Sequence, residues 1–512
     1  MFNTRLYRCG LATLLLCALT LPVSAQSFRV QCPSATALHP TGDGIKCQQI
    51  SGGDGFATMG DGTQTYLFAF GPLSGLANIY NGLPGTTTAS EFNQLSPIGV
   101  GAPSSLVGMP NGGFTFNGAI GLVPDPEAVV PCPGTTVAGG CLDGHVDPRP
   151  IMDVGVMNGS APAPLMAIDE DDEFFLTLTN VGQVMRPDLF EQHTVHFHGY
   201  PNASAFYDGV PDASVAINIG GSFTYYYLSP DAGTYFWHCH ITPPEHLQMG
   251  MVGQLYVRPR QNRVPAGTSL YTARTAQDAD LRTACVSAND ILCSHPLPAV
   301  NTAVNRAATG NYAYNDGDGS TYYDVEYPIQ MHGFDPNFHF VGMTFNPEGF
   351  ADMKDKFFLL NGRSYPDTVN PDPLQTQSAD GVYHFSQPLP TIVKITPGQR
   401  ALLRISDLNV SEYHTLASLG VPMQVIGYNA KLLRDQAGNN LYYTTNSITL
   451  GGGESLDVIL DTCAVRATPT DPSSACTTPM ATGTYYLFTP NLDHLSNDAE
   501  NFGGQMTEVR VM

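Results

Sequence analysis

Apolar and polar residues alternate in short runs along most of the chain, which is the pattern of half-buried β-strands. Two strands are predicted in the N-terminal part, at "TQTYLFAFG" (63–71) and "GGFTFNGAIGLV" (112–123). Further along, "APLMAIDEDDEFFLTLTNV" (163–181) predicts a strand, an acidic turn and a second strand. "GSFTYYYLSPDAGTYFWHCH" (221–240) predicts a strand pair around a turn, and "MVGQLYVRP" (251–259) completes the unit. Short strands at this spacing favour a β-sandwich.

A second set of strands repeats the first. "GTYFWHCH" (233–240) aligns with "GTYYLFTP" (483–490), and "HTVHFHGYP" (193–201) aligns with "HTLASLGVP" (414–422). The frames match, whereas most histidines do not, as expected of a duplicated domain in which one copy has lost a metal site. The changed pairs are His196 with Ala417, His198 with Leu419, His238 with Phe488, Cys239 with Thr489 and His240 with Pro490; the second copy keeps His414 and gains His494.

The N-terminus predicts export. Arg5 and Arg8 precede an apolar run that ends in Val23-Ser24-Ala25, as in a secretory signal peptide. The run is shorter than the roughly 20 residues that span a bilayer, so we expect a periplasmic or extracellular chain without a membrane span. The expected segments are a signal peptide (1–25), a Gly- and Pro-rich N-terminal extension (26–150), a first sandwich (151–260), a linker with a disulfide (261–324) and a second sandwich (325–512).

Charge and cysteine content narrow the function further. A net charge of −23 argues against nucleic-acid binding, which depends on Lys and Arg contacts to phosphate. Two of the 11 cysteines lie in the signal peptide, and eight others form close sequence pairs that predict four disulfides in an oxidising compartment. Cys239 alone stays unpaired, and a metal ion would explain a free thiol in an exported protein. The predicted pairs are Cys32–Cys47, Cys132–Cys141, Cys285–Cys293 and Cys463–Cys476.

The histidine spacing predicts two groups of metal ligands. Residues two apart in a strand share a face, so Cys239 faces away from the histidines on either side of it. His193, an odd step from His196, can share the face of Cys239. With His246 as second imidazole and Met251 as weak axial sulfur, this group matches the trigonal site of blue copper. The other group is His196, His198, His238 and His240, which present four imidazoles on one face.

At these residues the chain resembles the multicopper oxidases, the family of laccases and related copper oxidases. Their copper-bearing domain has an H-x-x-H-x-H-G motif and a later HCH motif, followed by a His and then Met or Leu. "FLLNGRSYPD" (358–367) and "ITPGQRALLRI" (395–405) also resemble the non-catalytic domain of this family. The resemblance implies an all-β fold of tandem cupredoxin-like Greek-key β-sandwiches, with a loop-rich N-terminal extension and a second domain that lacks a type 1 copper site.

The resemblance also implies a reaction. A small-molecule or metal-ion reductant would give electrons to a type 1 copper at His246, and these would pass through Cys239 to a histidine-rich copper site that reduces dioxygen. Cys239 and His246 would therefore be catalytic. The implied ligands are His193, Cys239, His246 and Met251 for type 1 copper, His196 for type 2 copper, and His198, His238 and His240 for type 3 copper.

The sequence departs from the family in three ways. Five residues separate His240 from His246 where three are usual, Phe197 replaces a Trp, and only four of the eight cluster histidines are present. Three alternatives follow. A homo-oligomer would complete the cluster, a mononuclear second site would act as in copper nitrite reductases, or a lone type 1 site would serve electron transfer. Neither the reducing substrate nor a role for His332, His339, His414 and His494 follows from the sequence.

Overall fold

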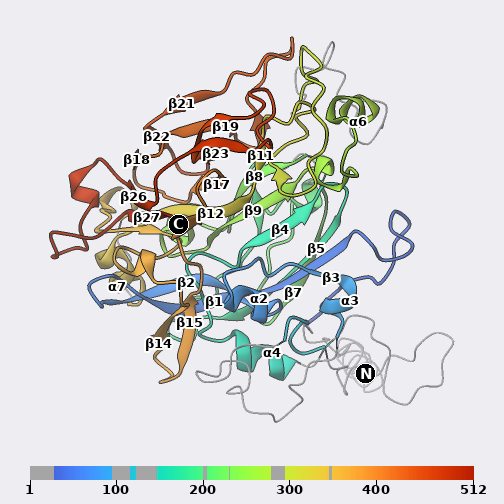
Figure 1. The fold of residues 1–512 in the computed structure, drawn as a ribbon. Helices are drawn as coiled ribbons and strands as arrows, with labels where there is room; N and C mark the ends of the chain where they lie inside the picture. The colour runs from blue at the N-terminus through green and yellow to red at the C-terminus, as the bar shows by residue number, and fades with distance from the viewer. Residues whose placement is uncertain are drawn as a thin grey trace, which may run out of the picture.

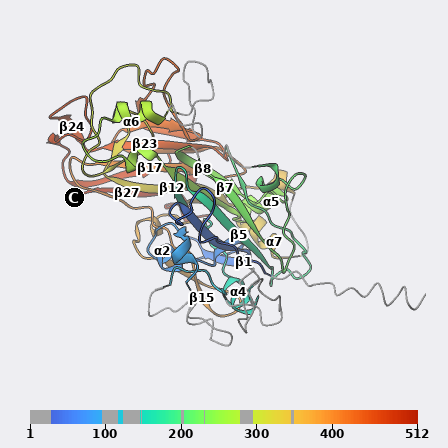
Figure 2. The same ribbon diagram turned by 90° about the vertical axis from the view of Figure 1, so that its right-hand side faces the viewer.

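The computed structural model describes residues 28–94, 116–122, 146, 148–199, 204–229, 231–277, 295–344 and 349–512, and these form two β-sandwiches (Figure 1). The predicted signal peptide lies outside the described residues. Figure 2 shows the second sandwich packed against one end of the first, with β8 near β17 and β23 at the junction. The predicted all-β fold of tandem cupredoxin-like sandwiches is therefore confirmed.

Two sheets form the first sandwich. The order of the larger sheet is β2-β1-β5-β7, with β3 paired to β1, and the order of the smaller is β4-β9-β8-β6. Apolar side chains from both sheets, among them Phe68, Leu176, Tyr225, Trp237 and Leu255, fill the space between them. The strands are β1 (Ile45–Thr58), β2 (Gln64–Pro72), β3 (Thr87–Thr88), β4 (Met166–Asp169), β5 (Glu173–Gly182), β6 (His196–Phe197), β7 (Ser222–Leu228), β8 (Gly233–His238) and β9 (Val252–Arg258).

The N-terminal segment supplies three strands of this sandwich, β1, β2 and β3. β1 runs parallel to β5, with Ile45 opposite Glu173, and antiparallel to β2. The first sandwich thus does not begin near residue 151, and residues 26–150 are more than an extension of it. β1 is buried on both faces, and its central "SGGDG" breaks the apolar alternation that marks a half-buried strand.

Other strand predictions have mixed outcomes. The strands expected within 63–71, 163–181 and 251–259 are confirmed as β2, β4 with β5, and β9. Residues 221–240 do contain two strands, but they are not a pair, because β7 bonds to β5 and β8 bonds to β6 and β9. The strand expected at 112–123 is wrong in its described part, residues 116–122, which form a turn and coil.

The second sandwich repeats the strand order of the first and extends it with β19, β20, β21 and β22. Its sheets have the orders β13-β12-β17-β23-β19-β20, with β21 paired to β19, and β16-β27-β26-β18-β22. His196 lies opposite His238 in the first sandwich, and Ala417 lies opposite Phe488 in the second, which confirms the alignment. The strands are β12 (Val325–Phe334), β13 (Phe357–Leu360), β16 (Val393–Ile395), β17 (Arg400–Asp407), β18 (His414–Leu419), β19 (Met423–Tyr428), β20 (Lys431–Leu432), β21 (Tyr443–Thr445), β22 (Ser447–Leu450), β23 (Ser455–Asp461), β26 (Gly483–Phe488) and β27 (Met506–Val511).

Short helices and ribbons connect these strands. The helices are α2 (Leu76–Tyr80), α3 (Ala89–Phe92), α4 (Pro148–Gly155), α5 (Pro243–Gln248), α6 (Leu270–Gln277) and α7 (Pro336–Gly342), and the 3-10 turns are η2 (Ala205–Tyr207), η3 (Arg260–Arg263), η4 (Phe350–Asp352), η5 (Asp367–Val369) and η6 (Leu492–His494). The two-stranded ribbons are β10 (Asn311–Tyr312) with β11 (Tyr322–Tyr323), β14 (Leu374–Gln377) with β15 (Tyr383–Gln387), and β24 (Cys463–Arg466) with β25 (Cys476–Pro479). Among the described helices, none has the length and apolar content needed to cross a bilayer.

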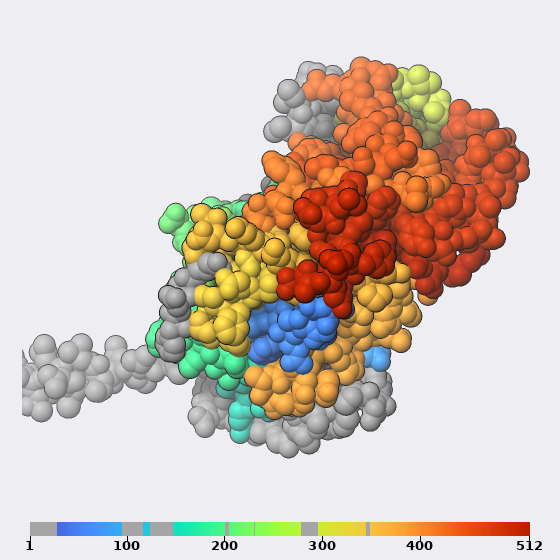
Figure 3. Space-filling model, turned by 90° about the vertical axis from the view of Figure 1, so that its left-hand side faces the viewer, coloured from blue at the N-terminus to red at the C-terminus, as the bar shows by residue number. Residues whose placement is uncertain are grey.

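Segments of the second sandwich enclose the β1–β2 hairpin. Figure 3 shows this hairpin in blue, bordered by yellow, orange and red segments of later sequence. Gln387 in β15 accepts a hydrogen bond from the Thr58 backbone N–H at 2.9 Å and donates one to the Thr58 carbonyl oxygen at 2.9 Å. The hairpin therefore belongs to the domain interface as well as to the first sandwich.

Two predicted disulfides are confirmed, Cys32–Cys47 and Cys463–Cys476. The cysteines of the other two pairs lie outside the described residues. Cys239 is a free, buried thiol.

A buried charge network joins the two sandwiches. Glu326 in β12 binds Arg258 of β9 at 2.8 Å and Arg404 of β17 at 3.0 Å. Burial acts to raise the pKa of Glu326, but the two guanidinium groups outweigh it and lower that pKa to about 2. The interaction of Glu326 with the two arginines therefore stabilises the fold fully above the unfolded pKa of Glu, about 4.3. This stability is lost as pH falls toward 2.

We expect Glu326→Gln to destabilise the protein by about 3 kcal/mol, because it removes the carboxylate shared by the buried Arg404 and the partly exposed Arg258, and leaves Arg404 only the more distant Asp457, at 3.7 Å. Urea unfolding at pH 7 measures the loss. Glu508→Gln is the matched control, since the Glu508–Arg510 pair lies partly exposed on one strand, where about 0–1 kcal/mol is expected. Equal losses in the two variants would contradict a role for this network.

Candidate metal centre

Strand alternation at the end of β8 separates the candidate ligands into two groups. β8 ends at His238, which pairs with His196 of β6. The next side chain, Cys239, turns into the core, and its thiol is fully buried. The structure thus places a thiol on one side of this strand end and imidazoles on the other, as the sequence predicts.

The first group contains His193, Cys239 and His246. One ligand atom from each lies within 4.8 Å of the other two. The Nδ1 atom of His246 is 3.3 Å from the Cys239 sulfur, and the rings of His193 and His246 are 5.4 Å apart. All three side chains are fully buried, so they form a compact nitrogen and sulfur site that excludes water.

The chemistry of this first group fits a copper ion. Burial lowers the pKa of His246 to about 4 and that of His193 well below its usual value, so both imidazoles are neutral ligands at pH 7. Both ring nitrogens of His193 are buried without a hydrogen-bond partner. Buried polar atoms normally have partners, and a metal ion would satisfy one of these nitrogens.

The loop after β8 brings the remaining residues into place. Its extra length forms α5, which starts with two prolines and carries His246 near its end. The Met251 backbone then accepts a hydrogen bond from Cys239 N–H at 3.1 Å and donates one to the His246 carbonyl oxygen at 2.8 Å. The Met251 side chain is buried in the same core cluster as Cys239, in accord with an axial role.

Two residues from the N-terminal strands complete the walls of this site. Gly52 of β1 faces His193, and a Cβ at this glycine would lie 2.8 Å from the His193 ring. Phe68 of β2 contacts the His246 ring edge-on at 6.1 Å between centroids. Sequence reasoning missed both residues, because only the long-range pairing of β1 with β5 brings them here.

The second group gathers His196, His198, His238 and His240 on one face. Ring centroids of neighbouring members lie 5.0–5.5 Å apart. Ligand atoms of His196, His198 and His238 lie within 4.8 Å of one another. This group is partly open to solvent, unlike the first.

Hydrogen bonds set the tautomers of this second group. The Nδ1 atom of His196 is 2.7 Å from the Asp208 carbonyl oxygen, and that of His238 is 2.6 Å from the Cys239 carbonyl oxygen. A carbonyl only accepts, so Nδ1 carries the proton and Nε2 keeps a lone pair. His198 also has a backbone hydrogen bond, to Gly453 of the second sandwich.

Two of these imidazoles need a cation between them. The Nε2 atoms of His198 and His238 face each other at 3.0 Å. Burial, reinforced by the neighbouring histidines, lowers the pKa values of these residues to about 4 and about 3, which disfavours a shared proton at pH 7. A metal ion bound by both nitrogens removes the repulsion between their lone pairs.

Sequence reasoning also missed two carboxylates beside the candidate metal ligands. A carboxylate oxygen of Glu191 is 3.7 Å from His246 Nε2, and one of Asp208 is 3.4 Å from His196 Nδ1. The spacing of the HxxHxHG motif does not include either residue. Glu191, two residues before His193, is the carboxylate that a sequence search around the motif could have found.

The histidines left unassigned by the sequence lie in the second sandwich. His332, His339, His414 and His494 are all buried. His414 and His494 have ring centroids 5.5 Å apart, and His339 bonds the Tyr66 carbonyl oxygen of β2. None of the four belongs to the two ligand groups found within the described ranges.

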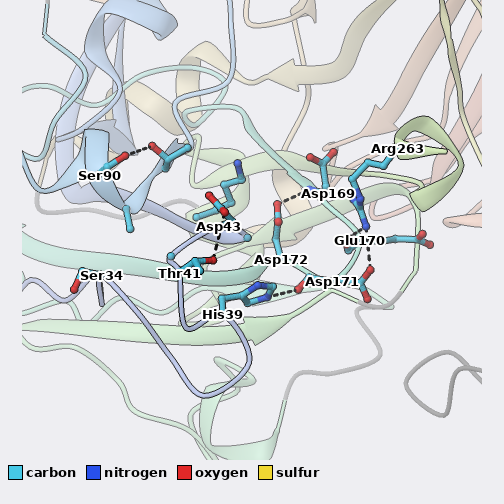
Figure 4. A pocket seen from close by; sticks show the side chains of 15 residues that line it. Ser34, His39, Thr41, Asp43, Ser90, Asp169, Glu170, Asp171, Asp172 and Arg263 are labelled. Carbon is cyan, nitrogen blue, oxygen red and sulfur yellow. Dashed lines mark hydrogen bonds and ion pairs between the residues drawn. The ribbon is translucent and has the colours of Figure 1, made fainter. Parts of the chain in front are cut away.

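A separate pocket of about 550 Å³ lies between the N-terminal segment and the acidic turn from β4 to β5 (Figure 4). Its carboxylates have partners: Asp171 binds Arg260 and Arg263, and Asp172 accepts a hydrogen bond from Asp169 N–H at 2.8 Å. No candidate copper ligand lines this pocket, so it is not part of the candidate metal centre.

We expect Gly52→Ala to weaken Cu²⁺ binding at the first group by roughly tenfold or more, because its methyl group would displace the His193 ring. Cu²⁺ titration with the thiolate absorption as readout measures this. The neighbouring Ser51→Ala, which loses only a hydrogen bond to the Gly71 carbonyl oxygen, serves as control. Unchanged Cu²⁺ affinity in Gly52→Ala would show that β1 does not constrain His193.

Comparisons with known proteins agree with this centre. The family model described as "Multicopper oxidase" matches residues 144–262. Laccase abr2 of Aspergillus fumigatus is 33% identical over 109 residues, which cover 21% of this chain and 17% of the laccase. The copper-containing nitrite reductase of Rhizobium meliloti is 34% identical over 109 residues, covering 20% of this chain and 26% of the reductase.

The matched segments span about a quarter or less of each of these two relatives. Among solved structures, the blue copper oxidase from Nitrosomonas europaea aligns with a TM-score of 0.47 at 16% identity, covering 91% of this chain and 85% of that one. The family match includes both ligand groups and Met251. Residues 144–262 therefore form a domain of the multicopper oxidase family.

Proposed function

We propose that the chain is an exported copper-dependent oxidase that oxidises a small reductant and reduces dioxygen to water. The observation that carries this proposal is the position of Cys239. Its buried thiol belongs to one ligand group, while the residues on either side of it, His238 and His240, belong to the other. One backbone segment thus joins a site for one-electron oxidation to a second group of imidazoles.

The residues fit copper in two environments, and members of the family bind type 1, type 2 and type 3 copper. Copper, when bound, would supply one-electron redox chemistry at both groups. His193, Cys239 and His246, with Met251 as axial ligand, would hold the type 1 ion. His196 would be a type 2 ligand, and His198, His238 and His240 would be type 3 ligands.

The protein supplies orientation and a dry, neutral first site. Burial of His193 and His246 keeps both imidazoles unprotonated, and the core packed around Cys239 excludes water from its sulfur. On the second face, the Asp208 and Cys239 carbonyl oxygens hold the Nδ1 protons, so that Nε2 is the ligating atom.

The reductant would approach the first group past two carboxylates. Glu191 lies against His246, and its carboxylate is partly exposed. Glu245, one residue before His246, repels Glu191 electrostatically. These groups would bind a cationic reductant or accept a proton from an organic one; both classes remain candidates.

A second copy of the chain would complete the second group. Within the described part of the chain, only these four histidines gather there, and their face is partly open to solvent. A two-fold or higher homo-oligomer would bring further ligands to that face. Export is supported by the leader-like pattern of residues 1–25 and by the two disulfides.

The second candidate function is that of a copper nitrite reductase. The nitrite reductase relative matches a segment of the same length as the laccase does, at similar identity. A mononuclear site would need fewer imidazoles than this face offers, and His196 and His240 would then have no ligand role. Their presence favours the oxidase. A type 1 electron-transfer protein would leave all four histidines without a function.

We expect Cys239→Ser to abolish both the blue absorption and turnover, because a hydroxyl does not replace the thiolate ligand or its link to the second group. The blue absorption and dioxygen consumption with a phenolic or Fe²⁺ reductant are the measurements. Oxidase activity that survives in this variant would overturn the proposed scheme.

We expect His198→Gln to keep the blue absorption but to lose dioxygen consumption and part of the bound copper. Copper per chain, with native mass on the same sample, measures this; the wild type should hold clearly more than one copper per chain. His384→Gln, which removes a histidine bonded only to Asp380, is the control. About one copper per chain in the wild type would favour electron transfer instead.

A further inference from the structure

The second sandwich contains a cluster of polar groups where the first has its thiol and imidazole site. His414 opens β18 at the position that aligns with His193, and the register of β18 with β26 matches that of β6 with β8. His414 is fully buried. Its surroundings differ from those of His193, because Thr489 aligns with Cys239, and carboxylates and amides lie around the His414 ring.

Three carboxylates lie around His414. One ligand atom each from Asp355, Glu412 and His414 lies within 4.8 Å of the other two. Asp407 Oδ1 is 3.8 Å from His414 Nδ1. His494 adds a second imidazole, with Nε2 at 3.2 Å from a Glu412 oxygen. The cluster therefore offers both oxygen and nitrogen ligands within the span of one metal ion.

Several atoms of this cluster are buried without a hydrogen-bond partner. Asp407 is fully buried, and its Oδ2 atom has none. The amides of Asn409 and Gln505 reach the His414 ring at 3.1 Å, yet both amide oxygens are unpartnered. The Nδ1 atom of His494 is unpartnered as well. The Gln505 oxygen can be satisfied by turning its amide toward the ring, which leaves three such atoms. Native interiors leave few of them, so three in one cluster indicate a missing ligand.

No basic side chain neutralises these carboxylates in the described part of the chain. The strongest charge effects on Asp355 and Asp407 come from other carboxylates, including Glu412. The neighbours Lys354 and Lys356 are exposed. Burying unpaired carboxylates is costly unless a proton or a cation neutralises them.

We propose that this cluster, formed by Asp355, Glu412 and His414 with Asp407 and His494 beside them, binds a divalent first-row transition-metal ion distinct from the copper sites. Imidazole nitrogen with carboxylate oxygen suits Zn²⁺, Mn²⁺, Fe²⁺ or Co²⁺, and the absence of a thiol excludes a type 1 site. The partly exposed carboxylate of Glu412 gives the ion a route from solvent.

The tautomer of His414 is compatible with this role. A neutral ring carries one N–H, so one of the two amides must present its oxygen to the ring. If Gln505 does so at Nδ1, its unpartnered oxygen is satisfied and Nε2 keeps a lone pair. Asn409 Nδ2 has another acceptor, the Glu412 carbonyl oxygen at 3.0 Å, and does not depend on that lone pair.

A further cluster of possible metal ligands has no histidine nitrogen available to bind an ion. Ligand atoms of Glu170, Asp231 and His295 also lie within 4.8 Å of one another. The Nδ1 atom of His295, however, accepts a hydrogen bond from Asn315 N–H at 3.3 Å, which places the ring proton on Nε2. A protonated Nε2 has no lone pair for a metal ion, and the lone pair of Nδ1 is already used by Asn315, so we assign no metal there.

Asp355 would link the proposed ion to the first sandwich by a hydrogen bond. Gln248, at the end of α5, donates a hydrogen bond to Asp355 Oδ1 at 2.9 Å. His332 also has a backbone hydrogen bond to Leu247 of the same helix. Since α5 carries His246, metal in the second sandwich would hold in place a helix that belongs to the proposed type 1 site.

The test uses Co²⁺ as probe on the full, copper-loaded protein, so that the copper sites are already filled. Equilibrium dialysis with elemental analysis gives Co²⁺ bound per chain, and the visible spectrum reports its ligands. We expect about one Co²⁺ per chain, with affinity reduced about tenfold or more in Glu412→Gln and His414→Gln. Glu508→Gln, a carboxylate on β27 paired with Arg510, should bind Co²⁺ like the wild type.

Two results would overturn the proposal. One is the absence of Co²⁺ binding beyond that of the His414→Gln variant, and the other is unchanged affinity in Glu412→Gln. Glu412→Gln alters a partly exposed side chain and keeps the test valid if the buried His414→Gln variant fails to fold. Because binding rather than oxidase turnover is measured, the outcome does not depend on the proposed function.

Discussion

The division of the candidate copper ligands into two groups depends on the alternation of side chains at one strand end. Because His238 and His240 share a side and Cys239 faces the other, one tripeptide contributes to a dry interior site and to an open histidine face. A shift of one residue in the register of β8 would exchange these roles. The pairing of β8 with β6 and β9 therefore keeps the two ligand groups on opposite sides of the strand.

The two sandwiches show how one framework holds different chemistry. The two share a common strand order and the same register at the ligand position. They differ in the polarity of the side chains that surround that position. In the first, apolar packing surrounds a thiol and neutral imidazoles. In the second, carboxylates and amides surround His414. The β-sheet fixes where a ligand lies, and the neighbouring side chains decide which ion suits it.

The sequence predicted the ligands because local spacing determines them. His196 lies in β6, and His193 and Cys239 lie close to the ends of β6 and β8, so their facing directions follow from residue number. The structure places His193 with Cys239 and His196 in the other group, as alternation requires. The four disulfide pairs were predicted from proximity along the chain, and both pairs within the described residues are confirmed.

Contacts between distant segments were not predictable in this way. The sequence of β1 resembles a Gly-rich loop, because the strand is buried on both sides and its apolar residues do not alternate with polar ones. The separation of β7 and β8 into different sheets depends on their partners, and nothing in the turn between them specifies it. The contacts of Gly52 with His193 and of Gly453 with His198 are consequences of these long-range pairings.

The parallel pairing of β1 with β5 also has a consequence for synthesis. Ile45 of β1 and Glu173 of β5 are partners, yet more than a hundred residues lie between them. At roughly 5–20 residues per second, β1 would leave the ribosome several seconds before its partner exists. During that time the hairpin of β1 and β2 has an unpaired edge, which is a site for wrong association. The "SGGDG" at the centre of β1 has low β-propensity and a charge, both of which disfavour pairing of that edge with another chain.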